Sequence, residues 1–580
     1  VGVVTARGLN IIGNTTGLRA TGVSTFTSDV TVNSVTVGKG TNSVATNTVL
    51  GVNALDAAVT GINNTAVGNQ ALTLNTSGAE NTSVGSETLE ANTTGQRNTA
   101  VGYRALEDNV TGNYNTAVGA YALPENTTGD HNTALGRNAL RYNTTADQNT
   151  AVGALALDGT TTGGSNVAVG YYALKANTTG TGNVAVGVNA LDANTTENYG
   201  TAIGFNVLTA NTSGTNPTAV GAYALNANTT GDYNTACGYS ALELNTTGAQ
   251  NTAVGYKSLE ANTTASNNTA VGHFALNANT TGAQNTAVGK DALDANTDAH
   301  DNTAMGVGAL GVMNGGVGRN CAFGNYSGDA ITTGNSNNLF GYQAGTSITT
   351  GSNNACMGTT AGHDLTTGDF NVAIGQEALD GATTVHSCIA IGYDALSTAN
   401  TSNSQVAIGR AAMQSNTSGE GVAVGAYALN SNTTGTQLTA VGYQALDNNT
   451  TGVRNTAVGH EALDDNTTAN DNTAVGAYAL QKCTTGISNT AVGAYALDAS
   501  TTAAYNTAVG RNCMGDCTTG SDNACVGENA AANLTTGVNN TIMGVGAGRD
   551  ITTASHNTAI GRAALGGSGS AITGSYNTGV

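Results

Sequence analysis

The chain has 580 residues and a net charge of −20, from 37 acidic and 17 basic residues. This acidic balance argues against nucleic-acid binding, which needs a basic face. No apolar run reaches the length of about eighteen residues that a membrane-spanning helix requires. The 80 glycines, 2 prolines and 9% charged residues suit a repetitive solenoid, and the fixed spacing of Val, Leu and Gly argues against disorder.

Residues 1–45 differ from the rest of the chain. In this segment apolar residues alternate with Ser and Thr in short runs, and Gly and Asn separate the runs, which is typical of β-strands. We therefore expect a β-rich lead-in over residues 1–45. Its runs are Leu9–Ile12, Ser24–Thr27, Val30–Val32 and Val35–Val37.

Residues 46–580 consist of copies of a seventeen-residue unit, of which residues 98–114 are one example. An apolar residue followed by Gly, here Val101-Gly102, marks each unit and occurs 31 times at this spacing. We call the apolar residue of the pair the anchor. Of the 30 steps between anchors, 28 are seventeen residues long. Repeats at a constant period of this length are the signature of a solenoid.

Each unit has room for two short strands and two turns. Thr99–Val101 and Arg104–Leu106 are β-prone, and Gly102 after the anchor predicts a corner with positive φ or a close backbone approach. The Asn-Thr-Thr-Gly element, clean at residues 92–95 and present as Asn-Val-Thr-Gly ending at Gly112 in this unit, predicts a turn with Gly in the left-handed conformation. The fold class we predict is therefore an all-β parallel β-solenoid of about 31 coils.

Residues 305–424 are the least regular part of this predicted shaft. One step there is eighteen residues, from Met305 to Phe323, and one is sixteen, from Ile408 to Val424. We expect a slight bend or a change of girth there. Because the sequence stops inside another unit, we also expect the shaft to continue beyond residue 580.

An exchange between two positions indicates which side chains share the interior. Most units have Leu five places after the anchor and Asn eight places after it, as in Leu106 and Asn109. In a minority the first becomes Gly or Ala and the second Ile or Leu, as in Gly328 with Ile331. Because cores conserve volume, both positions should face one interior.

We therefore expect Val101, Leu106 and Asn109 to point inward, with Asn109 in a ladder of stacked amides. Asn98, three places before the anchor, belongs to a second Asn column. An interior Asn also makes the many Asn-Thr-Thr sequons a by-product of stacking rather than glycosylation sites.

No catalytic, cofactor-binding or metal-binding residue is assigned, and we expect no enzymatic activity. Acidic residues follow the Leu, as in Glu107 and Asp108, and a solvated corner explains them better than glycoside hydrolysis or loose Ca²⁺ binding. Cysteines such as Cys356 occupy Ala positions, which favours buried free thiols over disulfides or metal ligands. The dispersed histidines suit surface or turn positions.

A single coil buries little apolar surface, so several chains should associate. One Val and one Leu contribute roughly 3–6 kcal/mol, whereas ordering the backbone costs on the order of 1–2 kcal/mol per residue. We expect a symmetric homo-oligomer, with a trimer favoured. Tyr side chains one or two places after the conserved Gly, such as Tyr103 and Tyr121, either cover a seam between chains or lie over the neighbouring coil.

The unit Asn-Thr-Ala-Val-Gly-Tyr-x-Ala-Leu-x-x-Asn-Thr-Thr-Gly resembles the repeats of long tail-fibre proteins of marine bacteriophages. Residues 20–27 also resemble segments of those fibres. The Asn-Thr-Ala-Val-Gly core is similar to the repeats of trimeric autotransporter adhesin heads, which are β-rolls.

The resemblance implies a structural fibre shaft in a virion, joined to other fibre or baseplate segments. It also implies that the fibre projects a tip, outside this sequence, that binds a host-surface glycan or protein. The alternatives are a bacterial surface adhesin or extracellular filament and, less favoured, a glycan-degrading tailspike.

Overall fold

The computed structural model describes residues 29–580 except 41, 43, 399 and 568. The described residues form an all-β parallel solenoid of about 31 coils with seventeen-residue repeats, which confirms the predicted fold class. These residues contain no helix, and therefore none long and apolar enough to cross a membrane. The chain divides into two compact units, residues 1–196 and 197–580.

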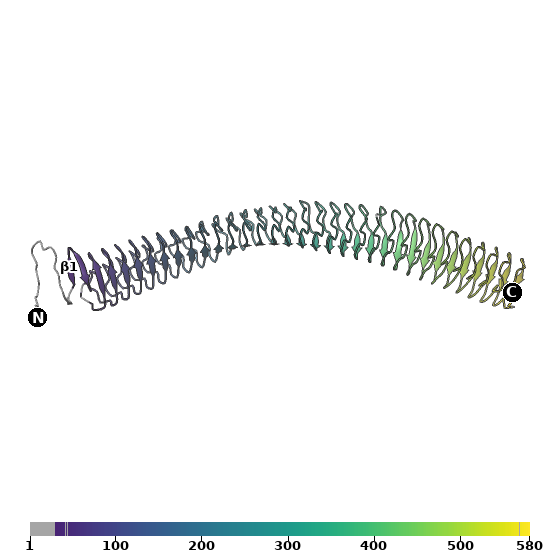
Figure 1. The fold of residues 1–580 in the computed structure, drawn as a ribbon, viewed down its shortest axis with the longest axis horizontal. Coiled ribbons are helices and arrows are strands. Elements are labelled where there is room, and N and C mark those ends of the chain that lie inside the picture. The colour runs from purple at the N-terminus through teal and green to yellow at the C-terminus, as the bar shows by residue number, and fades with distance from the viewer. Residues whose placement is uncertain (1–28, 41, 43, 399, 568) are drawn as a thin grey trace, which may run out of the picture. The chain divides into compact units, whose positions relative to one another are not determined.

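In the first unit a hairpin leads into the stack of coils (Figure 1). β1 and β2 pair antiparallel, β2 pairs antiparallel with β3, and each later strand pairs parallel with the next. The predicted runs Leu9–Ile12 and Ser24–Thr27 lie outside the described residues. The strands are β1 Val30–Val32, β2 Val35–Gly38, β3 Thr48–Gly51, β4 Thr65–Val67, β5 Thr82–Val84, β6 Thr99–Val101, β7 Thr116–Val118, β8 Thr133–Leu135, β9 Thr150–Val152, β10 Val167–Val169 and β11 Val184–Val186.

The second unit continues the same coil design, with one short strand in each coil. All its neighbouring strands pair parallel. The strands are β12 Thr201–Ile203, β13 Thr218–Val220, β14 Thr235–Cys237, β15 Thr252–Val254, β16 Thr269–Val271, β17 Thr286–Val288, β18 Thr303–Met305, β19 Cys321–Phe323, β20 Asn338–Phe340, β21 Ala355–Met357, β22 Val372–Ile374, β23 Ile389–Ile391, β24 Val406–Ile408, β25 Gly421–Val424, β26 Leu438–Val441, β27 Thr456–Val458, β28 Thr473–Val475, β29 Thr490–Val492, β30 Thr507–Val509, β31 Ala524–Val526, β32 Thr541–Met543, β33 Thr558–Ile560 and β34 Thr578–Gly579.

The register places identical positions of neighbouring coils on top of one another. Thr99 pairs with Thr116, and Val101 with Val118. The two irregular steps keep this register, since Met305 pairs with Phe323 and Ile408 with Val424. The extra residue of the longer step lies in the turn before β19, where Gly315, Gly316 and Gly318 all have positive φ. Turns therefore absorb the length changes, and the strands do not shift.

The predicted second strand is wrong. Arg104 and Leu106 have φ of 55° and 53°, so the segment alternates through the left-handed region and forms turns. Its backbone still bonds to both neighbouring coils. The Arg104 N–H donates to the Ser86 carbonyl and the Leu106 N–H to the Ala122 carbonyl, both at 3.0 Å. These inter-coil bonds offset the cost of left-handed residues, about 1–2 kcal/mol each.

The backbone at Gly102 and at Gly112 is restricted in different ways. Gly102 has a φ of 129°, and a Cβ there would lie 2.6 Å from the Gly119 carbonyl oxygen, so both parts of the corner prediction hold. Gly112 has no positive φ, which corrects the predicted left-handed turn. A Cβ on Gly112 would instead approach the Gly129 carbonyl oxygen at 2.5 Å and the Asn109 amide oxygen. Close packing, rather than backbone conformation, therefore restricts the turn that ends at Gly112.

The interior contains the Leu and Asn columns together, as the exchange predicts. Leu106 and Asn109 have no exposed surface. In a variant coil Ile331 is equally buried, and a Cβ placed on Gly328 would lie 3.0 Å from the Ile331 Cδ1 atom. The two positions therefore compete for one volume, and an apolar group at one excludes it from the other.

The expectation that Val101 shares this interior is wrong. Val101 is 36% exposed, whereas the preceding Ala100 is completely buried. Successive side chains of a strand point to opposite faces. Ala100 therefore faces Leu106 across the narrow coil, and Val101 faces outward with Thr99.

Candidate functional site

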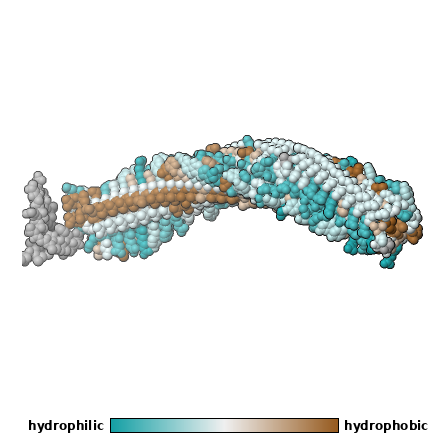
Figure 2. All heavy atoms as spheres, turned by 45° about the vertical axis from the view of Figure 1, so that its right-hand side comes forward, coloured by the Kyte–Doolittle hydropathy of each residue, from teal (hydrophilic) through white to brown (hydrophobic). Residues whose placement is uncertain are grey.

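The anchor residues face outward, and they form an apolar strip that runs from coil to coil within each of the two compact units. In the first unit it begins at Leu50, ends at Val186 and consists of Val and Leu only. Leu135 within it is 46% exposed. Figure 2 shows a brown hydrophobic band along this unit, next to white and teal surface. The Thr column two residues earlier, which includes Thr99, lies beside the strip on the same outward face. The candidate site is therefore an outward sheet face, whose Thr and apolar columns could pack against another β-surface.

The second unit repeats this outward face with different apolar side chains. Its column includes Ile203, Met305, Phe340 and Met357, which are between 37% and 44% exposed. The rings of Phe323 and Phe340 stack with centroids 5.0 Å apart. The exposed anchor column is therefore a property of the repeat rather than of one coil.

Behind this face, two amide ladders hold the coils in register. The Asn109 side-chain nitrogen donates to the Asn92 amide oxygen at 2.9 Å, and the Asn126 nitrogen donates to the Asn109 oxygen at 2.8 Å. Asn98 belongs to the second ladder. Its backbone N–H donates to the Asn81 amide oxygen at 2.9 Å, and its side chain donates to the Gly112 carbonyl at 2.8 Å. The Asn98 and Asn109 side chains therefore have partners both within and between coils.

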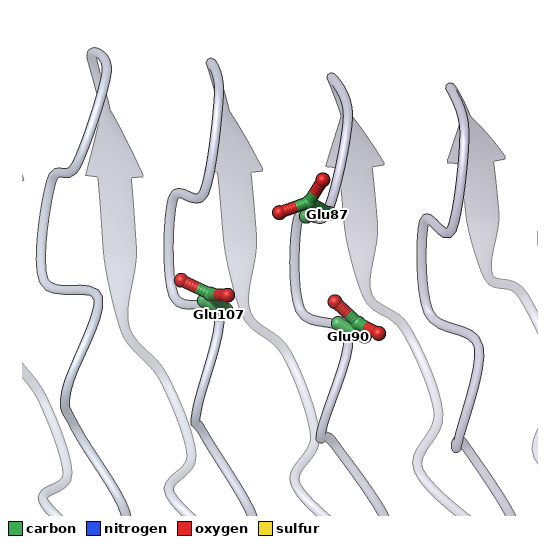
Figure 3. A group of neighbouring side chains, drawn as sticks. All are labelled: Glu87, Glu90 and Glu107. Atoms are coloured by element: carbon green, nitrogen blue, oxygen red, sulfur yellow. The ribbon is translucent and has the colours of Figure 1, made fainter.

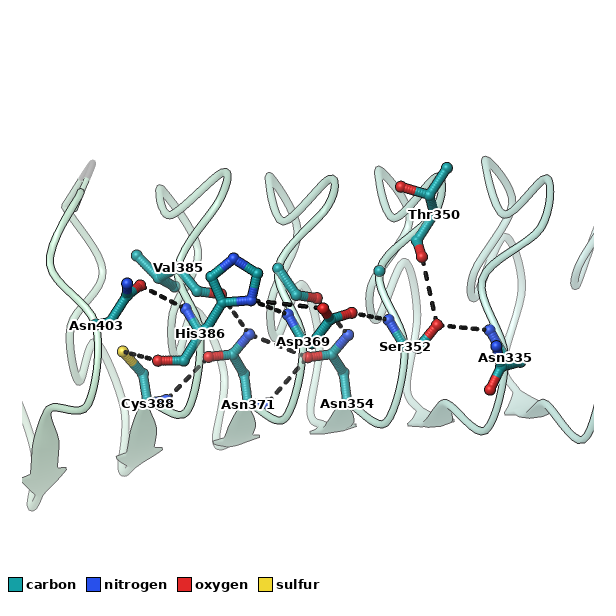
Figure 4. A network of polar contacts seen from close by, with 12 residues as sticks. Asn335, Thr350, Ser352, Asn354, Asp369, Asn371, Val385, His386, Cys388 and Asn403 are labelled. Carbon is teal, nitrogen blue, oxygen red and sulfur yellow. Dashed lines mark hydrogen bonds and ion pairs between the residues drawn. The ribbon is translucent and has the colours of Figure 1, made fainter.

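Sequence reasoning missed a third ladder, twelve places after the anchor. In Figure 4, Ser352, Asp369 and His386 follow one another along neighbouring coils. The Ser352 N–H donates to the Asp369 carboxylate at 2.7 Å, and the Asp369 N–H donates to His386 Nδ1 at 3.0 Å. The His386 N–H donates to the Asn403 amide oxygen at 2.8 Å. The signal in the sequence is the recurrence of Asp, Asn, Ser and His, all hydrogen-bond acceptors, at this position.

One group of carboxylates has the geometry of a cation site. Oxygens of Glu87, Glu90 and Glu107 lie within 4.8 Å of one another on two neighbouring coils (Figure 3). The Arg104 guanidinium lies beside them, 2.5 Å from a Glu87 oxygen and 3.5 Å from a Glu107 oxygen. Because Arg104 already neutralises part of this charge, the group forms an ion-pair cluster of the chain itself.

The acidic column six places after the anchor is half-buried, which corrects the predicted solvated corner. Burial raises the pKa of Glu107, Asp447 and Asp464. For Asp464, burial and the nearby Asp447, Asp465 and Glu461 carboxylates together raise the pKa to about 7. This column can therefore couple proton binding to the stability of the stack.

Whether a strand cysteine is buried depends on whether its position faces the interior or the outside of the coil. Cys237, at an anchor position, is exposed, while Cys356, at an Ala position, is fully buried. Burial raises the pKa of the Cys356 thiol to about 12. In a later coil, the Cys513 thiol donates to the Cys525 carbonyl at 3.3 Å. Thiols therefore replace small apolar side chains on both sides of the sheet.

No protein-family model matches this chain. No curated protein matches it at the level that would indicate common ancestry.

Proposed function

We propose that this chain is a shaft segment of an extended fibre, most consistent with the tail fibre of a bacteriophage, and that its copies associate through the outward Thr and anchor columns. The fibre would project a host-binding tip carried by another segment. The proposal assigns the chain a structural role and no catalytic step. What supports it most is the outward apolar column, which persists at one position of the repeat within each unit.

The energetics favour covering this column. The Thr-Ala-Val strand leaves Val101 36% exposed and Leu135 46% exposed. Covering such partly exposed side chains contributes roughly 0.5–1 kcal/mol per coil, scaled from full burial of Val or Leu. Many coils acting together exceed the entropy lost on association. A parallel homotrimer places the same column of each chain at a common axis.

Sedimentation equilibrium of the full chain tests the assembly. We expect a mass three times that of the 57.2 kDa chain at micromolar concentration. The triple variant Val84→Asp, Val101→Asp, Val118→Asp places charges in the strip, and we expect it to dissociate the assembly while the chain stays folded.

The matched control is Thr94→Asp, Thr111→Asp, Thr128→Asp, at exposed positions outside the strand of the same coils. We expect it to keep the wild-type mass. A monomeric wild-type chain, or equal loss of assembly in both variants, would refute the interface. The shaft role is tested separately by electron microscopy of the native particle, where a rod anchored in a bacterial outer membrane would favour an adhesin over a tail fibre.

A further inference from the structure

One region of the first unit departs from the repeat and forms a depression of about 600 Å³. Its lining includes Pro124, six places after the anchor, where the flanking coils have Glu107 and Arg141. Proline has a short side chain and is itself buried. The surface is therefore lowered at one coil between two coils that have long side chains. The size is within the range of small-molecule sites, about 300–1,000 Å³. We call this feature the Pro124 depression.

Contacts with neighbouring side chains, some of them outside the depression, hold Arg141 and Tyr121 in place. The Arg141 guanidinium lies 3.1 Å from the Asp158 carboxylate and stacks over the Tyr142 ring at 4.1 Å. Tyr121 packs edge-on against Tyr103, with ring centroids 5.2 Å apart. Fixed aromatic and guanidinium groups lose little conformational entropy when a ligand binds.

Charge around the depression is balanced, unlike the charge of the whole chain. Three guanidiniums and three carboxylates line it, in a protein with a net charge of −20. Arg137 also lines the depression, and it forms no ion pair with any residue that the structure describes. A balanced lining favours neither a simple anion nor a metal cation. It suits a neutral ligand that both donates and accepts hydrogen bonds.

We propose that the Pro124 depression binds a neutral oligosaccharide. Sugar hydroxyls donate to Glu107 and Glu125 and accept from Arg137, while the C–H face of a pyranose ring packs over Tyr121 and Pro124. Aromatic rings with a polar edge suit such amphipathic ligands. Every lining residue lies two, three, six or seven places after an anchor, so none belongs to the outward strand face. The site is therefore independent of the proposed assembly.

Saturation-transfer NMR and calorimetry on the full chain test this site, with maltotriose, cellotriose and diacetylchitobiose as neutral probes and sialyllactose as an anionic probe. We expect at least one neutral probe to bind. Tyr121→Ala and Arg137→Gln should each weaken that binding about tenfold, equivalent to ~1.4 kcal/mol. Pro124→Glu, which places the flanking residue type into the depression, should abolish it.

The matched controls are Tyr223→Ala and Arg511→Gln, at the equivalent positions of coils in the second unit. They should leave the affinity unchanged. Arg137→Gln alters an exposed side chain, so we expect the variant to keep its fold and any loss of affinity to come from the site itself. Failure of every neutral probe to bind, stronger binding of sialyllactose, or equal losses in the controls would overturn the proposal. None of these outcomes alters the mass measurement that tests the fibre assembly.

Discussion

The shared volume of the Leu and Asn columns leads to a double-mutant experiment in one coil. Leu106→Gly and Asn109→Ile together convert a standard coil into the variant type that has Gly328 and Ile331. If both side chains occupy one interior space, the second change should compensate for the first. We therefore expect the double variant to be more stable than the sum of its single changes implies.

The structure sets the size of each single effect. Leu106 is fully buried, so its truncation costs about 2–5 kcal/mol, reduced by roughly 1 kcal/mol because Gly accepts its left-handed φ. Asn109→Ile removes the donor to the Asn92 amide oxygen and the acceptor for Asn126, which costs about 1–3 kcal/mol. Overpacking against Leu106 adds about 1–3 kcal/mol. In the double variant the overpacking and the cavity cancel, so we expect a coupling of about 1–3 kcal/mol.

Hydrogen–deuterium exchange of the full chain is the appropriate assay, because each coil of a solenoid interacts chiefly with its neighbours. We expect faster exchange around residues 89–126 in each single variant and a partial return to the wild-type rate in the double variant. Leu480→Gly with Asn109→Ile, which lie in distant coils, is the control and should show no coupling. Additive effects in the Leu106 and Asn109 pair would refute the shared interior.

Two further outcomes follow from the corner glycine and the half-buried carboxylates. Gly102→Ala should destabilise its coil by at least ~2 kcal/mol, because a side chain there is strained and meets the Gly119 carbonyl. Gly112→Ala should cost less, about 1 kcal/mol from close packing, since its φ is not positive and Ala146 occupies the equivalent position. Asp464 has a folded-state pKa of about 7 against an ordinary 3.8, so folding stability should fall as pH rises between these values and level off above the higher one. Asp464→Asn should remove the Asp464 contribution to this slope and raise stability at pH 8 by roughly 1–2 kcal/mol, after allowance for solvent screening.

Guanidinium denaturation measures both effects. If Gly102→Ala and Gly112→Ala lowered the free energy of unfolding equally, the distinction between corner and turn would be contradicted. For the carboxylate, the exposed Asp522→Asn serves as the control and should leave the pH dependence as in the wild type. Stability of the wild-type chain that rises between pH 4 and pH 7 would contradict the assigned direction.

The repeat spacing and the exchange between positions determined much of this fold from the sequence. A constant period requires identical side chains to stack, so parallel coils and an interior Asn109 follow from the pattern alone. The Gly102 corner follows in the same way, because a position occupied by Gly in every unit must exclude a side chain. The Pro124 depression has only a weak signal, a single proline at a position where other units have longer side chains.

Only the tertiary structure decided which side of each strand faces out. Thr99, Ala100 and Val101 contain two apolar residues on opposite faces, and three residues are too few for alternation to identify the inward one. The narrow coil decides it, because Leu106 approaches from the opposite wall and leaves room only for Ala100. The same narrowness explains why Arg104 and Leu106 adopt left-handed turns where an extended strand was expected. A chain that must return within seventeen residues has no length for a second strand, and the apolar anchor is left on the outside.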